Sequence, residues 1–177
     1  MRNGRNGSAP IWIFGYGSLI FKADFPFIKR KPALIRDWER RFWQGSHDHR
    51  GTELFPGRVV TLIEALGSVC KGMGYLIDPV TLDHLDYREK NGYIRCDSRL
   101  LFDDGSSQSG LVYIATEKNE AFLGVASEWK IAAQIARSSG PSGQNADYLF
   151  ALANSLRELS AEDKHVFQIE SYLKQML

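Results

Sequence analysis

Apolar residues in the first two thirds of the chain occur in short runs, separated by glycine, proline and polar residues. This pattern is typical of strands bounded by turns. It predicts strands over 11–15, 33–43, 58–65, 70–77, 94–102 and 110–116. The break between the third and fourth strands falls near Gly67 and Ser68, and polar loops are expected over 46–57 and 103–109.

The helical pattern is concentrated in the last third of the chain, with one helix before it. Helices are predicted from Pro79 to about Asn91, over 127–138, over 146–159 and after a capping-box pattern at 160–163. Asp78 is a suitable N-cap for the first of them, because Pro79 then occupies the first helical position. Because strands come mostly first and helices mostly last, the order predicts an α+β fold.

Length and composition fit one globular domain. The chain has 177 residues, 44% of them hydrophobic and 24% charged, which is long enough to bury a core. We expect a flexible tail over 1–10 and a single domain over 11–177. The tail has basic residues but no apolar segment after them, so it does not resemble a secretory signal. No uninterrupted apolar run reaches the length of a membrane-spanning helix.

Charge and cysteine content narrow the function classes. The formal net charge is +1, whereas a nucleic-acid binder is usually strongly basic, so nucleic acid is not the expected partner. The two cysteines, Cys70 and Cys96, form no CxxC pattern. We interpret them as buried, unreactive thiols in a reducing compartment, and this places the protein in the cytoplasm.

A carboxylate near the end of the first predicted helix is a candidate for catalysis. Leu82, Leu85 and Glu89 share one helix face, and the two leucines predict that this face points inward. Desolvation raises the pKa of a carboxyl group, and a carboxylate poised nearer neutral pH is an effective general base. The alternatives are a salt bridge, for example to Arg88 or Arg95, and a solvated helix end.

The stretch FGYGSL follows the first predicted strand. Glycine lets a backbone approach a ligand and leaves N–H groups available to an anion. The stretch is not a dinucleotide fingerprint, because Ile20 stands where the third glycine belongs. It is not a nucleophile elbow either, because Gly17 directly precedes Ser18. A tight turn is the alternative interpretation.

Other polar residues have weaker patterns. His47 and His49 could supply two metal ligands, but no third ligand is marked, so a structural loop is the expected role and no metal is predicted. Arg50 could hold a carboxylate by a bidentate contact or lie at the surface. Tyr148, early in a predicted helix, and Tyr93 could point at a ligand or pack in the core.

Four motifs in one order resemble the ChaC-like γ-glutamylcyclotransferases. They are IFGYGSL, SHDHRGT followed by PGRVVTL, LDYREKNGY, and GPSGQNADYLFALANSLREL. The resemblance covers 11–159 and implies a small mixed β-barrel with peripheral helices. It implies an enzyme, a lyase, that degrades glutathione to 5-oxoproline and cysteinylglycine without a metal or organic cofactor. The chain departs from the family at Glu53, where proline is frequent, and at Asn91, where glycine is frequent.

The resemblance also implies roles for residues in these motifs. Glu89 would be the general acid/base, and the stretch from Ile13 to Leu19 would bind the γ-glutamyl end of the substrate. That stretch comprises Ile13, Phe14, Gly15, Tyr16, Gly17, Ser18 and Leu19. Tyr148 is similar to a tyrosine near the family's substrate pocket, and Arg50 lies in a family motif. Ser18 is then a positioning residue.

Two alternatives to a glutathione-degrading enzyme stay open. One is a cyclotransferase for other γ-glutamyl amino acids or amines. The other is a non-catalytic binding module on the same fold, against which the retention of Glu89 and of the whole glycine-containing stretch speaks.

Overall fold

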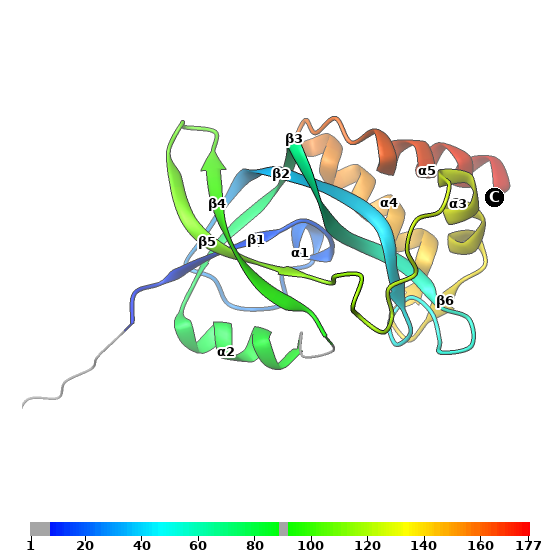
Figure 1. Ribbon diagram of the computed structural model, residues 1–177, viewed down its shortest axis with the longest axis horizontal. Coiled ribbons are helices and arrows are strands. Elements are labelled where there is room, and N and C mark those ends of the chain that lie inside the picture. The colour runs from blue at the N-terminus through cyan, green and yellow to red at the C-terminus, as the bar shows by residue number, and fades with distance from the viewer. Residues whose placement is uncertain (1–7, 89–91) are drawn as a thin grey trace, which may run out of the picture.

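A closed, mixed β-barrel is the centre of the computed structural model, which describes residues 8–88 and 92–177 (Figure 1). The strands are β1 (Ile11–Gly15), β2 (Lys29–Ser46), β3 (Gly57–Ile77), β4 (Ile94–Phe102) and β5 (Ser107–Ile114). Their order around the barrel is β1-β3-β2-β4-β5. β1 and β5 pair in parallel, and the other pairs are antiparallel.

Helices lie around this barrel. They are α1 (Ser18–Phe21), α2 (Pro79–Arg88), α3 (Glu128–Ala136), α4 (Asn145–Glu158) and α5 (Lys164–Met176). Figure 1 shows α3, α4 and α5 together on one side and α2 at the opposite end. A short hairpin of β6 (Ser139–Gly140) and β7 (Gly143–Gln144) precedes α4. The predicted α+β barrel with peripheral helices is therefore confirmed.

Two strand predictions were wrong in detail. The runs 58–65 and 70–77 belong to one long strand, β3, rather than to two. Opposite the expected break, Asp37 has a φ of 68° and its carboxylate accepts a hydrogen bond from the Gly67 N–H at 2.8 Å. This bulge bends the β2–β3 pair without ending it. β5 begins at Ser107 rather than at residue 110, because a tight turn with Gly105 at a φ of 83° joins it to β4.

The helix starts are fixed by side chains. Asp78 caps α2 as predicted, since its carboxylate accepts from the Val80 N–H at 2.9 Å. The last helix does not begin with the capping box at 160–163; Asp163 itself caps it, accepting from the Val166 N–H at 3.0 Å. Among the residues described, no helix is both long and apolar enough to cross a membrane.

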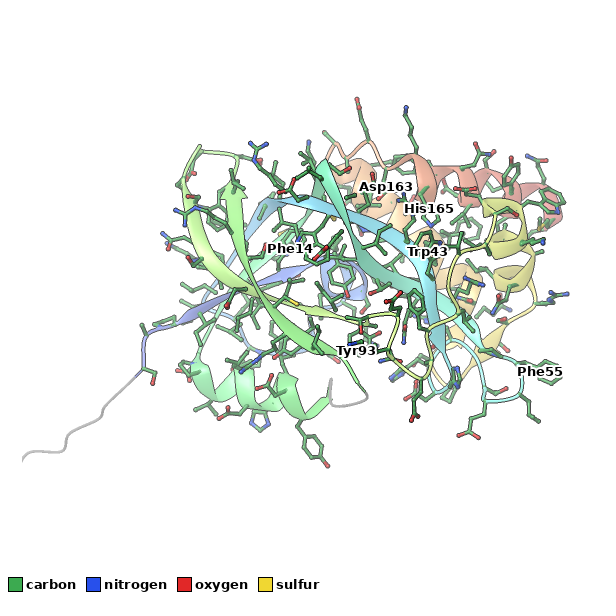
Figure 2. All side chains as sticks on the ribbon, in the orientation of Figure 1. Phe14, Trp43, Phe55, Tyr93, Asp163 and His165 are labelled. Atoms are coloured by element: carbon green, nitrogen blue, oxygen red, sulfur yellow. The ribbon has the colours of Figure 1, made fainter. Side chains whose placement is uncertain are left out.

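One hydrophobic core joins the barrel to the helices. Phe14 is buried within the barrel (Figure 2). The inward faces of α3, α4 and α5 are buried against the barrel and against each other. The barrel is thus closed by packing on the helical side. The site described below lies where β1 and β2 end.

Candidate active site

A cleft with a volume of about 1660 Å³ brings together segments that are far apart in the sequence. One wall is formed by residues 14–19, which we call the glycine wall. Another is formed by residues 44–50, at the end of β2, and by residues 116–121 after β5; we call these two segments the glutamine wall. Tyr148 from α4 and Gly92, Tyr93 and Tyr113 from the β4–β5 side are among the other residues that line it.

The glycine wall contains most of the predicted glycine-containing stretch. Phe14 and residues 16–19 line the cleft. Ile13 does not, because it is fully buried in the barrel core, and Gly15 pairs with Met73 in the β1–β3 ladder. The predicted binding stretch is therefore brought to the cleft except for these two residues, which support it from behind.

A buried arginine holds the glycine wall in place. Arg40 on β2 donates through Nε to the Tyr16 carbonyl at 2.6 Å and through one terminal nitrogen to the Asp163 carboxylate at 2.6 Å. Its other terminal nitrogen donates to the Lys71 carbonyl at 2.5 Å. In a trans peptide the C=O and the next N–H point in opposite directions, so the N–H of Gly17 points away from Arg40.

Tyr148 closes the cleft floor beside Gly17. A Cβ at Gly17 would lie 3.0 Å from the Tyr148 hydroxyl and 2.9 Å from Val60 Cγ2, so only glycine fits there. The hydroxyl oxygen accepts from the Val60 N–H at 3.4 Å, and no acceptor for its own proton is found within 8–88 and 92–177. Burial raises the pKa of Tyr148 to about 12, so the group is a neutral donor.

Arg50 lies over the same tyrosine. Its guanidinium carbon is 5.9 Å from the centre of the Tyr148 ring, and one terminal nitrogen donates to the Gln144 carbonyl at 3.1 Å. The Arg50 N–H is held by the Ser46 hydroxyl at 2.8 Å. Arg50 therefore stands at the cleft edge as a cation with donors left over for an anionic group.

The glutamine wall is organised by two amides. Gln44 Nε2 donates to Asn119 Oδ1 at 3.1 Å, and the Ala121 N–H donates to the same oxygen at 2.9 Å. Gln44 is 2% exposed although it lines the cleft. These two side chains connect β2 to the segment after β5.

The predicted catalytic residue, Glu89, lies outside the described residues. The helix before it behaves as predicted, because Leu82 and Leu85 are buried. Its Asp86 accepts hydrogen bonds from the Tyr113 hydroxyl at 2.6 Å and from Arg95 at 2.9 Å, which ties α2 to β4 and β5. Gly92 and Tyr93, which follow Glu89 in the sequence, line the cleft.

Two histidines lie in a loop that lines the cleft, and a third, His165, contacts β2 from α5. His47 and His49 lie in the loop after β2, as expected, and no cluster of three or more metal-binding side chains occurs in the described ranges. His165 accepts a hydrogen bond from the Phe42 N–H at 3.0 Å through Nε2, and its Nδ1 lies 3.3 Å from the Glu128 carboxylate. Figure 2 shows it beside Asp163 at the start of α5.

Sequence reasoning missed three polar residues of the site: Arg40, Gln44 and Asn119. Gln44 directly precedes the Gly45-Ser46 pair before the HDHRG loop, and its position at the end of a strand was the available signal. Arg40 is one of several charged residues on a strand, and nothing in the pattern distinguishes it from its neighbours. Asn119 lies in a polar loop of ordinary composition.

Comparison with known proteins gives one consistent result. The profile of the family described as "ChaC-like protein" matches residues 11–176. The chain is 42% identical over 180 residues to gamma-glutamylcyclotransferase 2-3 of Arabidopsis thaliana, covering 94% of this chain and 90% of that protein. It is 37% identical over 185 residues to human glutathione-specific gamma-glutamylcyclotransferase 1, covering 98% and 83%. The crystal structure of a yeast γ-glutamyl cyclotransferase specific to glutathione superimposes with a TM-score of 0.87 at 30% identity, covering 95% and 97%.

Proposed function

Because the chain belongs to the ChaC-like protein family, we propose that it is a γ-glutamylcyclotransferase that cleaves glutathione to 5-oxoproline and cysteinylglycine. The observation that carries this proposal is the match over nearly the full length of both chains to relatives named for this activity and this substrate. A cleft of about 1660 Å³ also has ample room for a tripeptide.

The chemistry needs a base and a donor for negative charge. The α-amino nitrogen of the γ-glutamyl residue forms a bond to its own γ-carbon, and the bond from that carbon to the cysteinyl nitrogen breaks. The ammonium nitrogen loses two of its three protons and keeps the third as the lactam N–H. One of the lost protons is transferred to the leaving nitrogen, and the second protonates the released amine. In this proposal Glu89 takes the proton from the ammonium and returns it to the leaving nitrogen. The substrate supplies proximity, so the protein has to fold it into a reactive shape.

The glycine wall suits the negative charges of the substrate. The N–H groups of Gly17, Ser18 and Leu19 and the Tyr148 hydroxyl would donate to the substrate carboxylate or to the oxygen of the γ-carbonyl as charge develops on it. Because the pKa of Tyr148 is about 12, its hydroxyl keeps its proton throughout the physiological range. Arg50 would attract a substrate carboxylate at the cleft edge.

The test is production of 5-oxoproline from glutathione by the wild-type protein and by Glu89→Gln. The amide is similar in size but cannot take up a proton, so we expect turnover to fall by about 10² to 10⁴-fold. Glu158→Gln, at an exposed position on α4, is the matched control and should behave as wild type. Turnover by Glu89→Gln near the wild-type rate would remove Glu89 from the mechanism.

Substrate preference is a separate measurement. Glutathione, γ-glutamyl-alanine and the two γ-glutamyl-lysine isomers share the reacting ring atoms and differ in the leaving amine. We expect glutathione to have the highest kcat/KM. A higher value for any of the other three compounds would assign the enzyme to the wider group of γ-glutamyl substrates.

The state of the thiols agrees with a reducing compartment, where we expect the enzyme to act. Cys70 and Cys96 are unpaired, and burial raises the pKa of both thiols. Cys96 is only half-buried, however, so the prediction of two buried thiols was correct for Cys70 alone.

A further inference from the structure

Two buried polar atoms of the glutamine wall have no hydrogen-bond partner within the described residues. They are Gln44 Oε1 and His47 Nε2, and the only similar atom found there, Trp43 Nε1, belongs to a residue that does not line the cleft. A buried carbonyl without a hydrogen-bond partner destabilises the fold, because its desolvation is not compensated. Such an atom on a cleft wall indicates a ligand that brings the missing group.

The orientation of the Gln44 amide follows from its neighbours. The Ala121 N–H can only donate, so the Asn119 atom that it meets has to be the oxygen. The Gln44 atom that faces this oxygen then has to be the nitrogen. The remaining atom, Oε1, is an acceptor, and the missing partner is a donor.

We propose that Gln44 Oε1 accepts a hydrogen bond from the α-ammonium group of the γ-glutamyl substrate and keeps that contact until the ring has closed. The inference rests on the proposed function and adds a substrate-binding residue to it. Gln44 would hold the nucleophile, as the glycine wall would hold the carboxylate and the γ-carbonyl oxygen.

The chemistry of the amine favours a neutral acceptor. A carboxylate would stabilise the ammonium form and raise the pKa of the nucleophile, which opposes the attack. An amide carbonyl binds –NH₃⁺ and –NH₂ alike, because both have N–H donors. The nitrogen loses one proton before the attack and one after it, and the product lactam still has one N–H. One acceptor can therefore hold the nitrogen during the whole reaction, with its lone pair directed at the γ-carbon.

The location of Gln44 agrees with this role. A Cβ placed on Gly92 would lie 2.8 Å from Asn119 Nδ2, so the Gln44–Asn119 pair lies close to Gly92. Gly92 follows Glu89 by three positions in the sequence. The nitrogen held by Gln44 is the one from which Glu89 has to remove a proton. The acidic side chains that line the cleft, such as Glu117 and Glu120, come from an exposed loop or its ends and do not replace a buried neutral acceptor.

The test uses Gln44→Met, which keeps the length of the side chain and removes the acceptor. A hydrogen bond to a charged group contributes about 1.5–3 kcal/mol, so we expect kcat/KM for glutathione to fall about 10- to 100-fold. Glutaryl-cysteinylglycine, which is glutathione without its α-amino group, is the probe for the contact. Its inhibition constant should change less than about twofold on Gln44→Met, because the compound has no ammonium group and makes no hydrogen bond that the substitution could remove. Gln134→Met, on α3 and outside the cleft, is the control for removing a hydrogen-bonded glutamine, and its kcat/KM should stay at the wild-type value.

Each outcome decides the proposal. Weaker binding of the deaminated compound, by as much as kcat/KM falls, would show that Gln44 supports the shape of the cleft and does not contact the ammonium. Unchanged turnover of glutathione by Gln44→Met would overturn the assignment and leave the proposed function intact. If wild-type protein makes no 5-oxoproline from glutathione, the proposed function and this inference both fail.

Discussion

The two walls of the cleft differ in how their polar groups are satisfied. On the glycine wall, the protein itself supplies the partners: Arg40 binds the Tyr16 carbonyl, and the Tyr75 hydroxyl binds the Leu19 carbonyl at 2.5 Å. On the glutamine wall, Gln44 Oε1 and His47 Nε2 have no partner within the described residues. The carbonyls that fix the backbone of the glycine wall have protein partners before a ligand binds, whereas Gln44 Oε1 on the other wall would obtain its partner from the ligand.

This difference matches the chemistry that each wall would face. Donors for a developing charge work best when they need no reorganisation, and a wall fixed by buried hydrogen bonds provides this. A carbonyl without a partner in the free protein forms its hydrogen bond only when the substrate binds. The free energy of that bond therefore contributes to binding of the nucleophile.

Removing the support of the glycine wall should have the largest effect. The Arg40–Asp163 pair is buried, with side chains 2% and 12% exposed, and loss of one partner leaves the other charge uncompensated. We expect Arg40→Met to lower the free energy of unfolding by about 3–5 kcal/mol, measured by urea denaturation. In the fraction that stays folded, the KM for glutathione should rise, because the Tyr16–Gly17 peptide loses its anchor.

The control is a pair of the same charges at the surface. Arg95 binds Asp86 at 2.9 Å, but the two side chains are 44% and 38% exposed. Exposed pairs contribute about 0–1 kcal/mol, so Arg95→Met should change stability little. If both variants lose the same stability, Arg40 does not have the special supporting role that we assign to it.

Loss of the Tyr148 hydroxyl removes a donor that lies beside the glycine wall and leaves the Arg40 support of that wall in place. We expect Tyr148→Phe to lower kcat/KM by about 10²-fold, because one donor to the developing oxyanion is removed. The lost acceptor for the Val60 N–H should cost about 1 kcal/mol of stability. Since burial raises the pKa of Tyr148 to about 12, the two pH–rate profiles should have the same shape below about pH 10.

Tyr172→Phe is the matched control, because Tyr172 packs on Trp129 at the helical side of the molecule. Its activity should equal that of the wild type. A change in the shape of the pH–rate profile of Tyr148→Phe near neutral pH would mean that the hydroxyl titrates in the reaction, contrary to a purely donating role.

Most strands and helices could be predicted because local chemistry determines them, whereas the barrel and the binding role of the glycine wall were expected only from the resemblance to the family. Alternation and turn residues define the strands, and Asp78-Pro79 starts α2 as its capping chemistry requires. The break predicted at Gly67 failed because the carboxylate of Asp37, 30 positions away in the sequence, satisfies the glycine N–H and keeps the strand paired. Such a contact has no local signature.

The glutamine wall could not be predicted for the same reason. The orientation of Gln44 depends on Asn119, 75 positions later, and on a main-chain donor at Ala121. Neither periodicity nor spacing reveals that one buried amide has an oxygen left over. Only the count of partners in the folded chain shows it.

The supports of the two walls also differ in their response to acid. Arg40 keeps its charge at any physiological pH, whereas β2 is held near Gln44 by the His165 imidazole, which accepts from the Phe42 N–H. Burial, and then the nearby Arg41, lower the pKa of His165 below its ordinary value of 6.5, and these effects outweigh those of Glu128 and Asp163. The unfolded chain therefore takes up a proton near pH 6.5 that the folded protein resists.

This sets the direction of the smallest effect. Above pH 6.5 His165 is neutral in both states and contributes no pH dependence; below it, the unfolded state binds more protons and stability falls. The contribution is at most about 1.4 kcal/mol per pH unit. The check is the free energy of unfolding, measured by urea denaturation at pH 7.5 and pH 5.5. His165→Gln should have a lower free energy of unfolding than wild type at pH 7.5, but this free energy should fall less than that of wild type on going to pH 5.5. His84→Gln, at an exposed position on α2, is the control and should follow the wild type. Equal losses in His165→Gln and wild type would show that the acid response arises elsewhere, and that the strand carrying Gln44 is no more sensitive to pH than the glycine wall.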